Sequence, residues 1–272
     1  MEDRISVSMT DGVADVRLVR ADKMNALDAA MFAALVDTAE RLSHEKGLRA
    51  VVLSGEGRAF CAGLDMGRFA AMNEGGGDGI GGAQKRDLSL RTHGLCNHSQ
   101  QAVWGWRQLP VPVIAAVHGV AFGGGFQLAL GADMRYVAPD VRMAVLEIKW
   151  GLVPDMAGVL LMPSLARNDV IRELTYTGRI FNGHEALQYG FATRVCDKPL
   201  EEALKTAHEI AGKNPHAIRA GKRLLNLALE GDAGTVLLAE TTEQVALIGS
   251  PNQVEAVTAN MQKRDPKFAS VA

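Results

Sequence analysis

The sequence lacks the features that tie small secreted domains together or carry a chain across a membrane. Its 272 residues include only three cysteines, which are widely spaced. They form neither a complete disulfide framework nor the paired spacing of a zinc site. No apolar run approaches the roughly 18–20 residues that a membrane-spanning helix needs, and the charged first residues do not resemble a secretory signal. We therefore expect a cytoplasmic protein with no membrane partner.

An excess of charge of one sign is also missing. The 29 Lys and Arg residues nearly balance the 31 Asp and Glu residues, and the formal net charge is −2. Such a chain has no positive electrostatic field that would attract a polyanion, which excludes non-specific binding of nucleic acid as its main role. With 47% apolar residues, the chain has an ordinary globular composition and enough length for a sizeable core.

Strand and helix signals alternate through the first part of the chain. Strand patterns cover residues 5–9, 13–18, 50–53 and 111–117. The last two strands each lead through a glycine-containing turn into a helix, which predicts an α/β spiral of stacked strand–helix units. From residue 200 onward the pattern is almost purely helical. We therefore predict a core over residues 1–199 and a helical region over 200–272.

One glycine motif carries no functional prediction. Residues 77–82 formally match G-x-G-x-x-G. A dinucleotide site needs a strand directly before this motif and a helix directly after it, and the sequence indicates neither. We interpret the surrounding stretch, residues 73–82, as a mobile surface loop.

Two other turns are better placed to bind a negative charge. Three glycines, Gly123 to Gly125, follow a buried strand and precede a helix, and Gly63 lies in a similar setting. Glycines leave backbone N–H groups unshielded, and the N-terminus of a helix favours an anion or a developing oxyanion. The alternative is that these glycines only allow a helix and a strand to pack closely. Two donors from separate turns would suit a carbonyl oxygen that becomes an enolate oxygen.

The two turns resemble the crotonase superfamily, also called the enoyl-CoA hydratase/isomerase family. The segments that carry the resemblance are Phe60-Cys61-Ala62-Gly63-Leu64-Asp65 and Ala121-Phe122-Gly123-Gly124-Gly125-Phe126. Residues 22–27 are similar to the family's R-P-x-x-x-N-A-L segment without its proline, and residues 263–268 to its K-R-x-P-x-F ending. The resemblance covers nearly the whole chain. It implies a crotonase-like ββα spiral core with a C-terminal helical trimerisation region, and a homotrimer or dimer of trimers.

The resemblance also implies roles for individual residues. The substrate would be an acyl-CoA thioester whose carbonyl accepts hydrogen bonds from the N–H groups of Leu64 and Gly124. Lys23 and the backbone around Ala62 are the candidates for binding coenzyme A within one chain. Lys263 would reach a CoA phosphate from a neighbouring subunit. Coenzyme A arrives as part of the substrate, so neither a separate cofactor nor a metal ion is expected.

The side chains beside this site determine which reaction of the family is catalysed. Enoyl-CoA hydratases carry two glutamates, of which the second corresponds to Glu147, whereas the first is replaced by Gln127. A neutral amide can hydrogen-bond a water molecule but cannot take its proton. Asp155, eight residues after Glu147, resembles the aspartate that dienoyl-CoA isomerases pair with a glutamate at that spacing. The alternative role of Asp155 is to cap a helix that begins near Met156.

The sequence therefore predicts a double-bond isomerase for an enoyl-CoA or dienoyl-CoA, with Glu147 as acid and base. The candidate catalytic groups are Glu147, Asp155, Gln127 and the backbone of Leu64 and Gly124. Two alternatives remain open. The first is a 2-enoyl-CoA hydratase that uses Glu147 despite Gln127. The second is a non-catalytic family member that binds acyl-CoA or RNA, although the retained glutamate and the lack of a basic stretch argue against RNA.

Overall fold

A six-stranded β-sheet lies at the centre of the described part of the molecule. The computed structural model describes residues 4–65, 67 and 87–271, so the glycine-rich stretch 73–82 lies outside it. The strands of the large sheet follow the order β1-β2-β3-β4-β6-β8, and a separate small sheet pairs β5 with β7. The first pair is an antiparallel hairpin and the other pairs are parallel. The strands are β1 (Ile5–Thr10), β2 (Val13–Leu18), β3 (Ala50–Gly55), β4 (Val113–Val117), β5 (Val120–Phe122), β6 (Met134–Val137), β7 (Arg142–Ala144) and β8 (Arg194–Val195).

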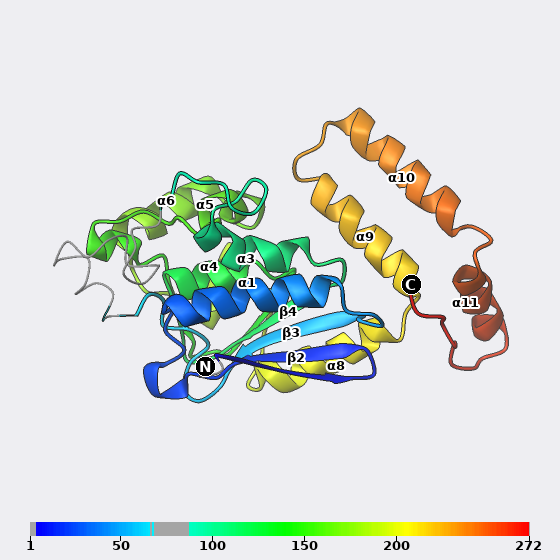
Figure 1. The fold of residues 1–272 in the computed structure, drawn as a ribbon, viewed down its shortest axis with the longest axis horizontal. Coiled ribbons are helices and arrows are strands. Elements are labelled where there is room, and N and C mark those ends of the chain that lie inside the picture. Colours follow the sequence, from blue (N-terminus) through cyan, green and yellow to red (C-terminus); the bar gives the residue numbers. More distant parts are fainter. Residues whose placement is uncertain (1–3, 66, 68–86, 272) are drawn as a thin grey trace.

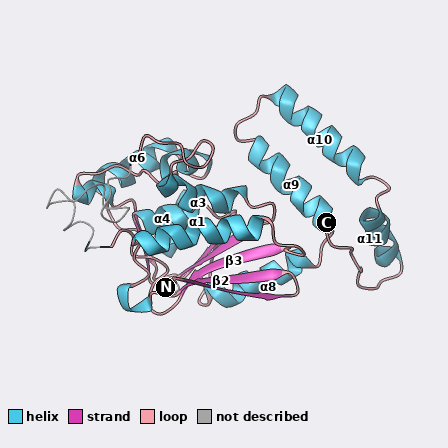
Figure 2. Ribbon diagram, in the orientation of Figure 1, coloured by secondary structure: helices cyan, strands magenta, loops and turns pink. Residues whose placement is uncertain are grey.

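Helices cover both faces of the large sheet (Figures 1 and 2). The described helices are α1 (Ala29–Ser43), α3 (His98–Gln108), α4 (Gly124–Leu130), α5 (Gly158–Leu161), α6 (Asn168–Thr177), α7 (Gly183–Tyr189), α8 (Pro199–Ala211), α9 (Pro215–Leu227), α10 (Ala233–Leu247) and α11 (Pro251–Met261). Short 3-10 helices occur at η1 (Ala21–Lys23), η2 (Glu147–Trp150) and η3 (Met162–Ser164). Helix α1 covers one face together with α3, and α8 covers the other.

Strand β3 shows why both faces of the sheet are buried. Val51 and Leu53 belong to the apolar cluster that includes α1, whereas Ala50 and Val52 belong to a second cluster that includes α8. A parallel strand covered on both faces needs apolar residues at every position. This explains the continuous apolar run that predicted the strand, and the predicted mixed α/β fold is confirmed.

Two elements differ from the sequence prediction. Helix α3 was not predicted, because its mostly polar sequence hides a narrow buried face that contains Ala102, Val103 and Trp106. The available signal was the capping box of Asn97 and Gln100. Strand β4 begins at Val113 and not at residue 111, because Pro112 has no N–H group to donate to the neighbouring strand.

The last three helices extend from the sheet as an arm (Figure 1). Helix α8 packs on the sheet, and the division of the chain at residue 199 stays a prediction. The arm is attached at its start, where Lys222 Nζ donates to Asp133 Oδ2 (2.7 Å) and to the Val111 carbonyl (2.8 Å). It is attached again near its end, where Arg49 Nη2 donates to the Phe268 carbonyl (3.3 Å). Within the described ranges, every helix is too short or too polar to span a membrane.

Candidate active site

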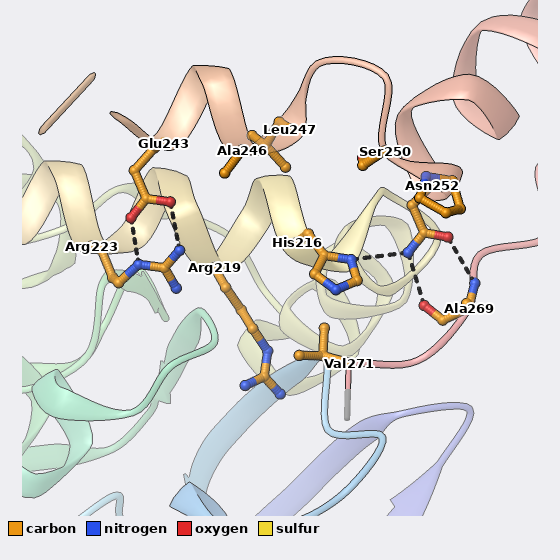
Figure 3. A pocket seen from close by; sticks show the side chains of 11 residues that line it. His216, Arg219, Arg223, Glu243, Ala246, Leu247, Ser250, Asn252, Ala269 and Val271 are labelled. Atoms are coloured by element: carbon orange, nitrogen blue, oxygen red, sulfur yellow. Dashed lines mark hydrogen bonds and ion pairs between the residues drawn. The ribbon is translucent and has the colours of Figure 1, made fainter. Parts of the chain in front are cut away.

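Two cavities of different character lie in the molecule. The smaller, of about 460 Å³, lies between α9, α10, α11 and the C-terminal segment (Figure 3). Two pairs of its polar groups bind each other: Arg223 makes two 2.7 Å hydrogen bonds to Glu243, and the ring of His216 contacts Asn252 at 3.0 Å. The larger cavity, of about 1060 Å³, brings together most of the candidate residues, and we take it as the candidate active site.

The walls of this larger cavity come from six parts of the chain. Apolar side chains dominate, and the acidic groups Glu147 and Asp155 lie among them. The lining residues are Asp22, Lys23, Met24, Ala26, Leu27, Phe32, Ala62, Gly63, Leu64, Asp65, Gly67, Leu88, Phe122, Gly123, Gly124, Leu146, Glu147, Lys149, Trp150, Leu152, Val153, Asp155 and Met156. An apolar cavity with few polar groups suits an acyl chain that carries one reactive thioester.

The two glycine turns predicted from the sequence lie side by side in the cavity wall. Backbone hydrogen bonds between Cys61 and the segment 120–122 join them, from Cys61 N to Val120 O and from Phe122 N to Cys61 O (both 3.1 Å). Gly63 has φ +85°, and a Cβ atom there would lie 2.5 Å from Phe122 O and 3.6 Å from Gly124 N. Only glycine fits this backbone conformation and this close contact.

The N–H groups of Leu64 and Gly124 are unused in this arrangement. Neither donates a hydrogen bond to another described residue, whereas the neighbouring amides of Ala62, Asp65 and Gly123 all do. Gly124 is the first residue of α4, where the N–H has no partner within the helix. Both residues line the cavity. Such free amides in a cavity wall are suited to bind a substrate oxygen.

Asn25 holds the first turn in place, and the sequence reasoning gave it no role. Its fully buried side chain donates from Nδ2 to the carbonyls of Glu56 (3.0 Å) and Ala59 (2.8 Å), and its Oδ1 accepts from Arg20 N (2.9 Å). Its own backbone has φ +55°. The signal that could have identified it is an asparagine in a predicted turn, since asparagine tolerates the left-handed conformation.

Asp65 is tied into the same turn as an ionised group. Burial alone would raise the pKa of Asp65, but hydrogen bonds from Arg20 and from Gly67 N outweigh it, so this pKa lies below its usual value. Arg20 also contacts Asp28 (3.5 Å), which caps α1 by accepting from Met31 N. Asp65 therefore supports the turn and is unsuited to carry protons near neutral pH.

Gln127 and Glu147 contact each other directly beside the glycine turns. Gln127 Nε2 donates to Glu147 Oε1 (2.6 Å), and Gln127 Oε1 accepts from Met156 N and from Gly158 N (both 2.9 Å). A Cβ atom on Gly123 would lie 3.3 Å from Glu147 Oε1. The carboxyl group of Glu147 thus lies next to the turn that presents the Gly124 amide.

The second oxygen of Glu147, Oε2, is buried and carries no hydrogen bond within the described chain. Burial raises the pKa of Glu147, the nearby charge of Asp155 raises it further, and the hydrogen bond from Gln127 counteracts both only in part. A desolvated carboxyl group in a cavity is a typical candidate for proton transfer.

Asp155 faces the cavity and caps no helix. Its side chain is exposed to the cavity, yet the surrounding protein shields it from bulk water and thereby raises its pKa. The helix-cap interpretation is wrong, because α5 begins only at Gly158, after Ala157 in a left-handed conformation (φ +67°). The Gly158 N–H that a cap at Asp155 would bind donates to Gln127 instead.

The remaining candidates fall into three groups. Lys23 and Ala62 line the cavity, and their contact with coenzyme A stays a prediction. Lys263 lies just after α11 in the arm and is exposed, outside the cavity wall of its own chain. Cys61 is packed and unreactive, since burial raises the pKa of its thiol to about 12 and Sγ donates to Asn25 O (3.1 Å). No group of His, Cys, Asp or Glu suited to a metal ion occurs in the described ranges.

Over nearly its whole length the chain is similar to proteins of one family. The sequence model of the family described as enoyl-CoA hydratase/isomerase matches residues 8–271. A mitochondrial Delta(3,5)-Delta(2,4)-dienoyl-CoA isomerase from Mus musculus is 31% identical, over 94% of this chain and 78% of its own. The peroxisomal enzyme of the same name from Arabidopsis thaliana is 29% identical, over 93% and 91%. The crystal structure of an enoyl-CoA hydratase from Bacillus anthracis superposes with a TM-score of 0.86 at 30% identity, over 98% and 99% of the two chains.

Proposed function

Because this chain belongs to the enoyl-CoA hydratase/isomerase family and is an enzyme acting on acyl-CoA thioesters, we propose that it moves double bonds within an enoyl-CoA or dienoyl-CoA. The reaction starts from the thioester carbonyl and proceeds through an enolate. Glu147 and Asp155 are the proton-transfer groups, and the amides of Leu64 and Gly124 hold the carbonyl oxygen.

The hydrogen bonding of Gln127 is the observation that carries this proposal. Addition of water through two carboxylates needs one group that accepts a proton from the water and another that delivers one to carbon. The Gln127 amide is no base, and both lone pairs of its Oε1 accept backbone N–H groups. It therefore has no acceptor left with which to orient a water. Glu147 and Asp155 are the two carboxyl groups of the cavity whose pKa burial raises.

The proposed reaction is a movement of protons along a conjugated chain. Ionised Glu147 removes a proton from the carbon next to the thioester, and the electrons move onto the carbonyl oxygen. Hydrogen bonds from Leu64 N and Gly124 N stabilise that oxygen by roughly 3–4 kcal/mol per donor. Protonated Asp155 then returns a proton to the far end of the conjugated system, and the double bonds move toward the thioester. Exchange with water restores both carboxyl groups.

The raised pKa of each carboxyl group supports a role in proton transfer for both. Burial raises the pKa of Glu147 and of Asp155, and two interacting carboxyl groups do not lose their protons independently. One member of such a pair can stay protonated while the other is ionised. An acid and a base are then present at once, as proton transfer at two carbons requires.

The arm formed by α9, α10 and α11 supports a proposed trimer or dimer of trimers. Helix α10 buries no residue, and Leu237, Leu238 and Val245 are each more than half exposed. Apolar faces of this kind are usually covered in an assembly. Lys263 would then contact a CoA phosphate bound to a neighbouring copy. The cytoplasmic location stays a prediction, since the two isomerases named above are mitochondrial and peroxisomal.

A substrate comparison tests the reaction. The purified protein is incubated separately with 3,5-dienoyl-CoA, 3-enoyl-CoA and crotonyl-CoA, and the products are separated by chromatography. We expect isomerisation of at least one of the first two, and a loss of about 10²–10⁴-fold in Glu147→Gln. Glu230→Gln, at an exposed position after α9, is the matched control and should behave as wild type.

The other outcomes each point to a different function. Rapid hydration of crotonyl-CoA without isomerisation would refute the proposal in favour of the hydratase. Turnover that is unchanged in Glu147→Gln would remove Glu147 from the mechanism. Binding of the thioesters without any turnover would favour a non-catalytic role.

A further inference from the structure

We infer that Gln127 is a positioning residue, which fixes the carboxyl group of Glu147 and joins it to the turn that carries Asp155. The chemical benefit of this arrangement rests on the proposed function, whereas the arrangement itself can be tested without substrate. Gln127 is not among the residues that line the cavity. It therefore acts on the substrate only through Glu147.

The orientation of the Gln127 amide is determined by its neighbours. Two backbone N–H groups, from Met156 and Gly158, point at one atom of the amide, and only oxygen can accept both. The nitrogen must therefore face Glu147 Oε1 at 2.6 Å. A flipped amide would leave two buried N–H groups without a partner and place two acceptor oxygens together, both of which are unfavourable.

This contact distinguishes the two oxygens of Glu147. Oε1 is held by Gln127, whereas Oε2 has no partner in the described part of the chain and remains able to accept a proton. An exposed glutamate would rotate freely about its side-chain bonds. Here the held oxygen restricts that rotation and keeps Oε2 as the basic atom.

The same amide also fixes the neighbouring turn. Met156 and Gly158 flank Ala157, whose left-handed backbone (φ +67°) is unfavourable for a residue with a Cβ atom. Two hydrogen bonds to one buried oxygen hold this turn together, and Asp155 directly precedes it. One side chain thus sets the separation between the two proposed proton-transfer groups.

The surroundings fit an amide at this position and disfavour an acid. Gln127 is 1% exposed, and a Cβ atom on Gly158 would lie only 2.6 Å from its Oε1. A carboxylate in its place would put two acidic oxygens in contact and force them to share a proton. The charged groups that face Glu147 in the cavity are Asp22, Lys23, Asp65, Lys149 and Asp155.

Gln127→Glu tests the inference because it keeps the acceptors for Met156 N and Gly158 N and replaces only the donor to Glu147. We expect kcat for isomerisation at pH 7 to fall at least about tenfold, with a smaller change in KM. The acidic limb of the pH–rate profile should move to higher pH, so that activity is partly recovered in alkaline buffer. Gln188→Glu, on an exposed face of α7, adds the same charge at a distance and should leave the profile unchanged.

A second variant and a second measurement keep the test decisive. In Gly158→Ala the added Cβ atom would lie 2.6 Å from Gln127 Oε1 and displace the amide. The acidic limb of the pH–rate profile should again move to higher pH. Carbon-13 NMR of labelled glutamates, with Glu147 assigned through Glu147→Gln, follows the titration of Glu147 in folded protein without any substrate. We expect Glu147 to titrate at higher pH in Gln127→Glu than in wild type.

The two proposals fail in different ways. If wild type isomerises neither substrate but Glu147 still titrates at higher pH in Gln127→Glu, the proposed reaction is wrong and the positioning role stands. If the pH profile and the titration of Glu147 are the same in Gln127→Glu, Gly158→Ala and wild type, the positioning role is refuted.

Discussion

A methyl group added at Gly63 should disable the pair of free amides without touching either carboxyl group. The Cβ atom of Gly63→Ala would lie 2.5 Å from Phe122 O, whereas ordinary contact begins at 3.4 Å. The two turns must therefore separate by about 0.9 Å, because backbone atoms on both sides cannot rotate out of the way as a side chain would. A displacement near 1 Å at a reacting centre costs about 10²-fold in rate, and the loss of one donor costs about 10²–10³-fold.

Gly47→Ala is the matched control for this substitution. Gly47 has φ +81°, close to the +85° of Gly63, but an added Cβ atom there would meet nothing within 4 Å. Both variants should lose about 1–2 kcal/mol of stability from the left-handed backbone, seen as a melting temperature a few degrees lower. Only Gly63→Ala should lose activity, by about 10²–10³-fold in kcat.

The assay follows ultraviolet absorbance as double bonds move into conjugation with the thioester. Circular dichroism confirms that both variants are folded at the assay temperature. Wild-type kcat in a folded Gly63→Ala would refute the reasoning, because the amides would then function while displaced. An equal loss in Gly47→Ala would assign the effect to general destabilisation.

Two further predictions concern the carboxyl groups. Burial raises the pKa of Glu147, so the charged form of this group destabilises the folded state above that pKa. The melting temperature of Glu147→Gln should therefore be higher than that of wild type at pH 8, and the difference should shrink toward pH 4. A melting difference that is independent of pH would contradict this. Asp155→Asn should lose about 10²–10⁴-fold on 3,5-dienoyl-CoA but less on 3-enoyl-CoA, since a single carboxyl group can serve two nearby carbons but not two distant ones. Equal losses on both substrates, measured as kcat, would contradict a separate role for Asp155.

The parts of the site that follow from local sequence were predictable. Gly63 and Gly123 have the positive φ angles that favour glycine, and at Gly124 and Gly125 a Cβ atom would clash with neighbouring atoms, so the residue type marks both turns. Glu147 and Asp155 were identified through the family resemblance, by their positions after the glycine turn and their spacing of eight residues. The sequence also correctly identified the strands that place these turns, because their apolar runs reflect burial on two faces.

The parts that depend on contacts between distant segments were not predictable. An amide at position 127 was evident, but the capture of its oxygen by Met156 N and Gly158 N depends on a turn 29 to 31 residues away. The helix cap that was the alternative role for Asp155 is absent for the same reason, since Gln127 accepts from the Gly158 N–H that the cap needed. Asn25 was missed because its partners are backbone carbonyls beyond residue 55, and no local pattern records such bonds.

The C-terminal arm is attached to the rest of the molecule at both its ends, so it is not free to swing about a single hinge. Lys222 anchors α9 beside β6, and Arg49 holds the segment that returns from α11. Asn252 adds a pair of 2.9 Å hydrogen bonds between α11 and Ala269. Any displacement of α10 is thus resisted by two attachments to the sheet region, one at Lys222 and one at Arg49. The angle at which the arm projects is consequently set by contacts within this chain.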